Sequence, residues 1–281
     1  MEGDRFILPN SKEKSVCSKN IRKQCPGRKN MAHDALGRSE KALPMETSLG
    51  QLKAELQSLA DPERARILSR FFKTGKGQYG EGDVFLGITV PGQRSVAKRY
   101  HALSLKDIEK LLLSGIHEHR LAALLILVIQ YKKADDRSRR KIIDFYLSHT
   151  GRINNWDLVD LSAEKILGDY LVDKDKAVLY RLAQSRNLWE RRMAIIATFA
   201  FIKNNAFEDT LRIAEMLLDD HHDLIHKAAG WMLREIGKRD LKSEEEFLQK
   251  YHGSMPRTML RYAIERFGPD RRRYWMSRIK K

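Results

Sequence analysis

Hydrophobic positions recur with helical spacing once the chain passes Ser48. Leu49, Leu52, Leu56 and Leu59 follow one another at intervals of three or four residues, which places them on one face of a helix. The same kind of spacing continues toward the C-terminus, and no alternating run rich in Val, Ile and Thr interrupts it. The pattern predicts an all-α fold.

Capping residues indicate where individual helices begin. Asp61-Pro62 combines an N-cap with a proline at the first helical position. Ser104 and Asp107 have the spacing of a capping box, and Gly115 is expected to end the helix that follows them. Later helices are expected near 117–133, 137–149, 155–168, 175–186, 188–204, 208–219, 222–237, 241–252 and 256–267.

A short pattern repeats along these helices. A basic residue stands two positions before a small one at the start of an apolar helix in His119–Ala123, Arg191–Ile195 and His226–Gly230. The basic residues Arg120, Arg192 and Lys227 are 72 and 35 positions apart, close to two periods and one. A period near 35 with two helices per unit predicts a HEAT-like α-solenoid of stacked helical pairs, whose concave cleft is a common place for an extended ligand. An irregular helical bundle is the alternative.

The charge balance indicates the kind of partner. The chain has 281 residues, 42% of them hydrophobic, and a formal net charge of +16, so it can bury a large core and attract polyanions. Its longest apolar run, Leu121–Ile129, is too short for a membrane span, and Met1–Pro9 lacks the apolar region of a secretory signal. We therefore expect an intracellular, cytoplasmic and nucleoid-associated monomer without membrane contact.

Residues 1–45 differ from the rest of the chain. They hold ten Lys and Arg against five Asp and Glu, with no sustained hydrophobic period, which predicts a disordered basic extension ahead of a functional domain at 46–281. Two alternatives are that this extension folds on DNA and that Met45 is the natural start. Cys17 and Cys25 are the only cysteines, so the sequence after residue 25 excludes disulfides, thiolate-bound zinc and iron–sulfur clusters.

Two patterns resemble functional motifs but lack the context that those motifs need. Gly75–Gly80 matches GxGxxG, but a helical pattern precedes it where a dinucleotide site needs a strand, so we interpret it as a flexible connection. The pairs His117/His119 and His221/His222 lack the four-residue spacing that places two imidazoles on one helix face. We expect these histidines to face solvent rather than a metal.

The best candidate for chemistry lies at the start of the helix predicted near 155. Asn155 is the expected N-cap, and Trp156 and Asp160, four residues apart, share one face. This placement sets a carboxylate one turn from an indole ring. The same residues also suit a buried tryptophan beside a capping aspartate, so the pattern alone does not decide between function and packing.

Tryptophans and arginines alternate on later helices. Trp231 and Arg234 are three apart on one helix, and Trp189 with Arg191-Arg192 opens another. Aromatic rings can stack on bases or sugars while guanidinium groups bind phosphates. From Arg257 onward nine Lys and Arg stand against two acids, which extends the basic character. The alternative is that each Trp anchors its repeat in the core, which we favour for Trp189.

Several segments together closely resemble the AlkD-type DNA alkylation repair proteins, in order, from about residue 48 to 275. They are Phe71–Gly75, Gly80–Asp83, Asn155–Asp160, Leu188–Arg192, Lys227–Arg234 and Pro256–Ala263. The resemblance implies a HEAT-like α-solenoid that acts as a glycosylase in base excision repair. Its substrates would be cationic N-alkylated purines in duplex DNA, such as 3-methyladenine and 7-methylguanine, and it would use no metal or organic cofactor.

The resemblance also implies a set of site residues. It places the catalytic carboxylate on Asp160 and the two cleft tryptophans on Trp156 and Trp231. The implied DNA contacts are Arg192, with Arg191 as the alternative register, then Arg234 and, as a candidate only, Tyr79. The resemblance further implies recognition without a deep base-flipping pocket, which predicts tolerance of bulky alkyl groups.

One carboxylate is chemically sufficient for such a substrate. Ordinary glycosidases use two, because a neutral leaving group must be protonated as the bond breaks. A cationic purine leaves as a neutral base, so Asp160 would only stabilise the developing charge on the sugar and direct a water, with Arg192 on a phosphate. Two other hypotheses remain: a DNA-lesion-binding protein without catalysis, and a scaffold for an acidic protein partner.

Overall fold

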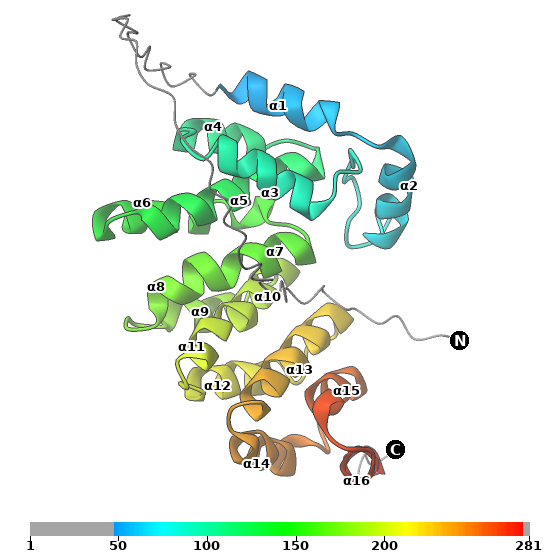
Figure 1. Cartoon of the computed structure of the whole chain (residues 1–281). Helices are drawn as coiled ribbons and strands as arrows, with labels where there is room; N and C mark the ends of the chain where they lie inside the picture. Colours follow the sequence, from blue (N-terminus) through cyan, green and yellow to red (C-terminus); the bar gives the residue numbers. More distant parts are fainter. Residues whose placement is uncertain (1–47, 278–281) are drawn as a thin grey trace, which may run out of the picture. The chain divides into compact units, whose positions relative to one another are not determined.

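Helices follow one another from Leu49 to Ser277, mostly with short connections and with a longer one between Phe71 and Val90 (Figure 1). The computed structural model describes residues 48–277, and among these the single β-type pairing is an isolated bridge between Val84 and Ile116. The all-α prediction is confirmed. The elements are α1 (Leu49–Ser58), α2 (Pro62–Phe71), α3 (Val90–Arg99), α4 (Leu105–Leu112), α5 (His117–Lys133), α6 (Asp136–Ser148), the 3₁₀ turn η1 (Thr150–Arg152), α7 (Trp156–Ala163), the π-helical turn η2 (Glu164–Gly168), α8 (Asp169–Leu171), α9 (Ala177–Ala183), α10 (Leu188–Ala197), α11 (Phe199–Lys203), α12 (Glu208–Met216), α13 (Asp223–Gly237), α14 (Leu241–Tyr251), α15 (Arg257–Ala263), the 3₁₀ turn η3 (Ile264–Arg266) and α16 (Pro269–Ser277).

The predicted caps form as hydrogen bonds. Asp61 accepts from two backbone amides at the start of α2, with proline in the first turn, and Ser104 accepts from the Asp107 amide at the start of α4. Helices α3 and α16 were not predicted, although Thr89 caps α3 just before Val90-Pro91. The helix expected over 188–204 is broken between α10 and α11.

The second helices of successive pairs form one row through the molecule. Helices α5, α7, α10, α13 and α15 each pack against the next, and α4, α6, α9, α12 and α14 precede them in the chain (Figure 1). Their starts are separated by 39, 32, 35 and 34 residues. The structure therefore carries a helical-pair repeat of about the length that the sequence predicted.

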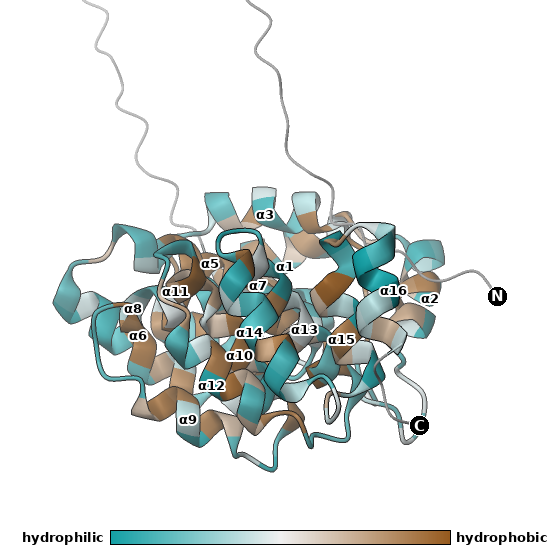
Figure 2. Cartoon of the chain, turned by 90° about the horizontal axis from the view of Figure 1, so that it is seen from below, coloured by the Kyte–Doolittle hydropathy of each residue, from teal (hydrophilic) through white to brown (hydrophobic). Residues whose placement is uncertain are grey.

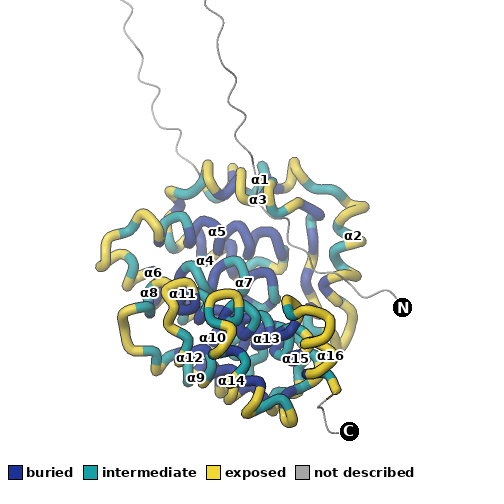
Figure 3. Tube along the Cα trace, turned by 60° about the horizontal axis from the view of Figure 1, so that its bottom comes forward, coloured by how far each residue is buried: buried dark blue, intermediate teal, exposed yellow. Residues whose placement is uncertain are grey.

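This row supplies much of the hydrophobic core. Hydrophobic residues concentrate on the central helices, whereas α16 and the connecting loops are largely hydrophilic (Figure 2). Helix α5 is buried along most of its length, while α2 has no buried residue (Figure 3). A glycine allows α13 and α15 to approach closely, because a Cβ at Gly230 would stand 2.4 Å from the carbonyl oxygen of Met259 on α15.

The predicted extension at residues 1–45, with Met45, lies outside the described residues. Over the described range 48–277, no helix is both long enough and apolar enough to cross a membrane.

Candidate active site

Asn155 is the N-cap of helix α7, as predicted. Asn155 is fully buried, and its side-chain oxygen accepts a hydrogen bond of 2.8 Å from the Trp156 amide. Trp156 is half-buried at the first helical position, and Asp160 lies one turn later. The cap therefore fixes the backbone from which both candidate side chains project.

Asp160 is held by a bidentate pair with Arg192. The Arg192 Nε and Nη2 atoms donate to the two Asp160 carboxylate oxygens at 2.9 and 2.8 Å. The two side chains are only 6% and 14% exposed, in the order Arg192 and Asp160. A further Arg192 nitrogen donates to the carbonyl oxygen of Leu224. Arg192, on α10, therefore ties α7 to the start of α13.

Opposing influences act on the pKa of Asp160. Burial raises the pKa of the Asp160 carboxyl, the Arg192 fork opposes this rise, and the negative charge of Asp157 adds to it; the net shift is upward. Low exposure makes the interaction between the carboxylate and its guanidinium stronger than it would be in water. The site thus contains a poorly hydrated carboxylate that forms a bidentate ion pair with Arg192.

A column of stacked rings supports Trp156 from one side. Phe72 lies parallel to Trp156 with ring centroids 5.1 Å apart, and Phe71 meets the same indole edge-on at 5.9 Å. Phe72 stacks in turn on Phe85 at 5.0 Å, and Phe85 on His117 at 4.5 Å. Phe71 is 48% exposed, whereas Phe72 is buried. The indole is therefore anchored by the segment between α2 and α3.

Tyr79 lies close to the same group. Its ring packs edge-on against Trp189 at 5.9 Å, and its hydroxyl donates to the Phe71 carbonyl oxygen at 3.4 Å. Burial raises the pKa of Tyr79, while a hydrogen bond with Trp156 and the charge of Arg192 oppose the rise. The loop that follows α2 thus brings a tyrosine beside Trp156 and Arg192. Trp189 is 7% exposed, as its predicted anchoring role requires.

Trp231 and Arg234 lie further along α13. The Trp231 Nε1 atom donates to Glu235 Oε1 at 3.0 Å, and its ring lies 6.0 Å from Phe199. Arg234 forms ion pairs with Glu235 and Glu265. Leu224, whose carbonyl binds Arg192, stands seven residues before Trp231, so the two lie on the same side of α13 about two turns apart.

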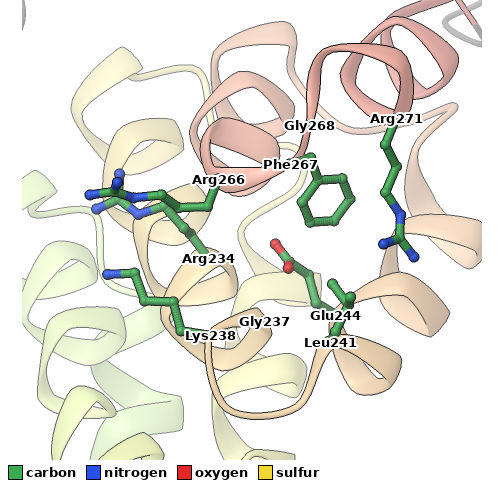
Figure 4. Close-up of a pocket in the computed structure, with 9 residues that line it drawn as sticks. All are labelled: Arg234, Gly237, Lys238, Leu241, Glu244, Arg266, Phe267, Gly268 and Arg271. Carbon is green, nitrogen blue, oxygen red and sulfur yellow. The ribbon is translucent and has the colours of Figure 1, made fainter.

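Arg234 also lines a cavity of about 210 Å³ between α13, α14 and α16 (Figure 4). The guanidinium groups of Arg234 and Arg266 lie side by side there, and the Lys238 ammonium points the same way (Figure 4). Glu244 projects into this cavity, is 1% exposed, and has one carboxyl oxygen without a hydrogen-bond partner among the described residues. Burial raises the pKa of Glu244 to about 8.

The two arginines of the Arg191-Arg192 pair have different partners. Arg191 binds Asp220 at 2.6 Å and the carbonyl oxygen of Ser185 at 3.0 Å, so it connects the loop before α10 with the loop before α13. Only Arg192 of this pair reaches Asp160. In the structure the Arg192 guanidinium contacts a carboxylate and a carbonyl, whereas the sequence-based expectation gave it a DNA phosphate.

The expectation of solvent-facing histidines is wrong for the first pair. His117 and His119 are 2% and 6% exposed, because α5 runs through the core and both sit in its first turn. His117 bonds to Asp83 and Asp157, and His119 to Ser114. In the second pair, His221 is exposed and His222 half-buried.

The connection between α2 and α3 is fastened near its end, beyond the Gly75–Gly80 segment for which the sequence predicts flexibility. The carboxylate of Glu118 accepts hydrogen bonds from the backbone amides of Leu86, Gly87 and Ile88 at 2.8 to 3.2 Å. Gly87 has φ 87° and lies so close to the Asp61 carbonyl that no Cβ would fit. Asp83 and Glu118 were missed because these partners are 30 or more residues away in the chain.

Within the described part of the chain, no group of three or more His, Cys, Asp or Glu is arranged to hold a metal ion.

Comparison with known proteins places this chain beside DNA repair proteins. A family model described as DNA alkylation repair enzyme matches residues 52–267. Among solved structures, the chain is similar to one described as a predicted DNA alkylation repair enzyme from Enterococcus faecalis, with 17% identity and a TM-score of 0.60 over 75% of this chain and 97% of that one. Another, smu.31 from Streptococcus mutans UA159, has 18% identity and a TM-score of 0.44 over 77% and 96%. No curated protein matches the sequence.

Proposed function

The chain belongs to the DNA alkylation repair enzyme family, and we propose that it is a DNA glycosylase that excises cationic N-alkylated purines, such as 3-methyladenine and 7-methylguanine, from duplex DNA. The observation that carries the proposal is the Asp160–Arg192 pair beside Trp156, a carboxylate of 14% exposure with a single fixed cation. On this proposal residues 46–281 are the glycosylase domain, which acts as a monomer.

Asp160 supplies the negative charge that the reaction needs. As the bond between C1′ and the purine breaks, its electron pair moves to the base and neutralises the base's charge. Positive charge then develops on the deoxyribose, where a carboxylate that is poorly screened by water stabilises it strongly. A water oxygen bonds to C1′, and the proton that the water loses passes to solvent. The base already carries its extra positive charge, so no general acid is needed.

In this scheme Arg192 orients the Asp160 carboxylate and opposes the rise of its pKa. Its two donors fix both carboxylate oxygens, which sets the direction in which the remaining lone pairs point. Its charge also opposes the upward shift that burial gives to the Asp160 pKa. The Arg192 charge thereby favours the ionised carboxylate, the form that the proposed reaction needs to stabilise a cationic sugar.

The tryptophans would contact the sugar and its neighbours. Trp156 is held by Phe72 and Phe71, so one part of its ring is supported and the rest faces away from this stack. An electron-rich ring face favours a cationic sugar over a neutral one. Trp231 would contribute a second face from α13, with Arg234 and Tyr79 as further DNA contacts. The net charge of +16 would draw the duplex onto the protein.

Release of 7-methylguanine from methylated duplex DNA tests the proposal. The wild type should release the base, and Asp160→Asn should reduce the rate at least about 100-fold, because it removes a charge that acts in the transition state. Asp144→Asn is the matched control, since Asp144 is a 61% exposed carboxylate on α6. Its rate should equal that of the wild type.

Each alternative function predicts a different result. A wild type that binds methylated DNA without releasing a base would establish a lesion-binding protein. A wild type that neither binds nor cleaves such DNA would leave the protein-scaffold hypothesis. Equal release by the wild type and Asp160→Asn would refute the role of Asp160 while leaving glycosylase activity in place.

A further inference from the structure

A buried charge network lies directly behind the start of α7. His117 is 2% exposed, and its two ring nitrogens contact two different aspartates: Nδ1 is 3.1 Å from Asp83 and Nε2 is 2.8 Å from Asp157. Both aspartates are themselves almost entirely buried. A carboxylate only accepts hydrogen bonds, so a ring that bonds to two of them donates from both nitrogens. This geometry is that of an imidazolium between two carboxylates.

The other charged and polar groups around His117 complete the network. Arg120, one turn later on α5, donates to Asp83 at 2.5 Å, and the Asn155 amide nitrogen donates to the same carboxylate at 3.1 Å. Two carboxylates therefore face two cations, and the charges balance when His117 is protonated. Burial by itself lowers the pKa of His117, but Asp157 and Asp83 outweigh it and raise the pKa to about 9, against the opposing charge of Arg120.

Two routes connect this network to the candidate active site. Asn155 and Asp157, the neighbours of Trp156 in the chain, are both bonded into the network, so the backbone of Trp156 is held on each side. The second route runs through the ring column in which His117 stacks on Phe85, Phe85 on Phe72, and Phe72 on Trp156. Phe85 and Asp83 come from the connection between α2 and α3.

The network also affects the charge of Asp160. The negative charge of Asp157 raises the pKa of Asp160, and His117 is the cation that contacts Asp157. A neutral His117 would leave the carboxylates of Asp157 and Asp160, three residues apart on α7, with one neighbouring positive charge fewer. Loss of the His117 proton thus acts on both the position and the charge of the site.

We propose that His117 is a positioning residue: clamped between Asp83 and Asp157, it fixes the first turn of α7 and so sets Trp156 and Asp160 for the reaction. The inference rests on the proposed function for its kinetic test, but the clamp itself can be tested without it. His117 does not touch the substrate in this scheme and acts only through its neighbours.

The kinetic test uses His117→Gln, Asp83→Asn and a matched control, His149→Gln. His149 also pairs with a carboxylate, Glu109, but with neither aspartate of the network. Single-turnover release of an alkylpurine is measured from pH 6 to 10, and each variant's rate is divided by that of the wild type at the same pH, which removes the substrate's own pH dependence.

A clamp predicts distinct rate ratios. His117→Gln should be slowed roughly 10- to 100-fold at pH 7, the cost of a small misplacement, and should approach the wild type above pH 9, where the wild type loses the same charge. Asp83→Asn should show its largest deficit between pH 7 and 9, because His117 loses an anionic neighbour and deprotonates earlier. His149→Gln should match the wild type throughout. Ratios that do not vary with pH would overturn the inference.

Amide hydrogen exchange and nitrogen NMR test the clamp by measurements that do not depend on glycosylase activity. In His117→Gln the amides of 156–163 should exchange faster while those of 257–263 stay unchanged, and wild-type His117 should carry two N–H protons at pH 7 and lose one near pH 9. Unchanged exchange in α7, or a neutral His117 at pH 7, would overturn the proposal. If His117→Gln fails to fold, Asp83→Asn and the NMR titration decide. A wild type without glycosylase activity would refute the proposed function and leave these two measurements standing.

Discussion

At the scale of single residues, Arg192 holds both carboxylate oxygens of Asp160 and opposes the rise that burial gives to the Asp160 pKa. Arg192 occupies the basic position of the repeated pattern, and the equivalent residues Arg120 and Lys227 also pair with an aspartate, Asp83 and Asp223 respectively. The pattern was visible in the sequence. Its partners were not, because each of the two arginines reaches an aspartate more than 30 residues earlier in the chain.

Removing the Arg192 charge should move the acidic limit of activity. On the proposed function Asp160 acts in its ionised form, so the rate should fall as pH drops through its pKa, and Arg192→Gln should raise that pKa by deleting the opposing cation. The pH–rate profile should therefore fall off at higher pH than in the wild type. Breaking a buried pair on one side should also destabilise the fold by about 3 kcal/mol. Arg191→Gln, which spares Asp160, should leave the acidic limit in place; a shared shift in both variants would contradict this role.

Glu244 should make the free energy of unfolding depend on pH between about 4.5 and 8. Burial raises its pKa from 4.5 to about 8, so its contribution is fully present below pH 4.5 and is lost as pH rises through 8. At pH 9, Glu244→Gln should be more stable than the wild type by on the order of 3 kcal/mol, and near pH 4.5 the two should be similar. Denaturant unfolding at both pH values measures this difference.

Glu246→Gln is the control for that measurement, because Glu246 lies on the same helix and is 65% exposed. It should change stability little at either pH. A gain for Glu244→Gln that is the same at both pH values would show that Glu244 is not a buried acid in the folded protein.

At the scale of elements, contacts between helices depend on small residues at fixed places. A Cβ at Gly230 would also stand 2.6 Å from Tyr262 Cβ, so Gly230→Ala would push α13 and α15 apart. We expect a loss of about 1–3 kcal/mol in the free energy of unfolding, as for other overpacked interfaces. Gly151→Ala, where a Cβ meets nothing within 4 Å, is the control and should be close to neutral. Equal effects of the two substitutions would contradict this account of the packing.

Helical elements could be predicted from the sequence because their signals are local. Periodic hydrophobic residues and the caps Asp61 and Ser104 located α2, α4 and α5 closely. The connection between α2 and α3 could not be predicted, since its conformation depends on Glu118 and His117 of α5. In the same way, Trp156 and Asp160 could be paired by spacing on one helix, whereas Phe72 and Arg192, which hold them, come from other parts of the chain.

At the scale of the whole molecule, the protein is basic, belongs to a DNA repair family and is built on a row of packed helices. Asp160 lies on one helix of this row, α7. The described residues bring Asp160, Arg192, Trp156 and Tyr79 together from α7, α10 and the loop after α2. Trp231 and Arg234 lie further along α13, the helix whose first turn Arg192 ties to α7. The repeat thus supplies several helices to one site, and the net charge of +16 supplies attraction to DNA without sequence preference.

Single-turnover excision of cationic 7-methylguanine and neutral 8-oxoguanine from the same duplex tests directly whether the charge of the substrate makes one carboxylate sufficient. The wild type should release only the cationic base, and Asp160→Asn should slow this release at least about 100-fold while DNA affinity is preserved. Release of both bases at similar rates, or undiminished release by Asp160→Asn, would contradict a mechanism in which one carboxylate suffices because the substrate brings its own positive charge.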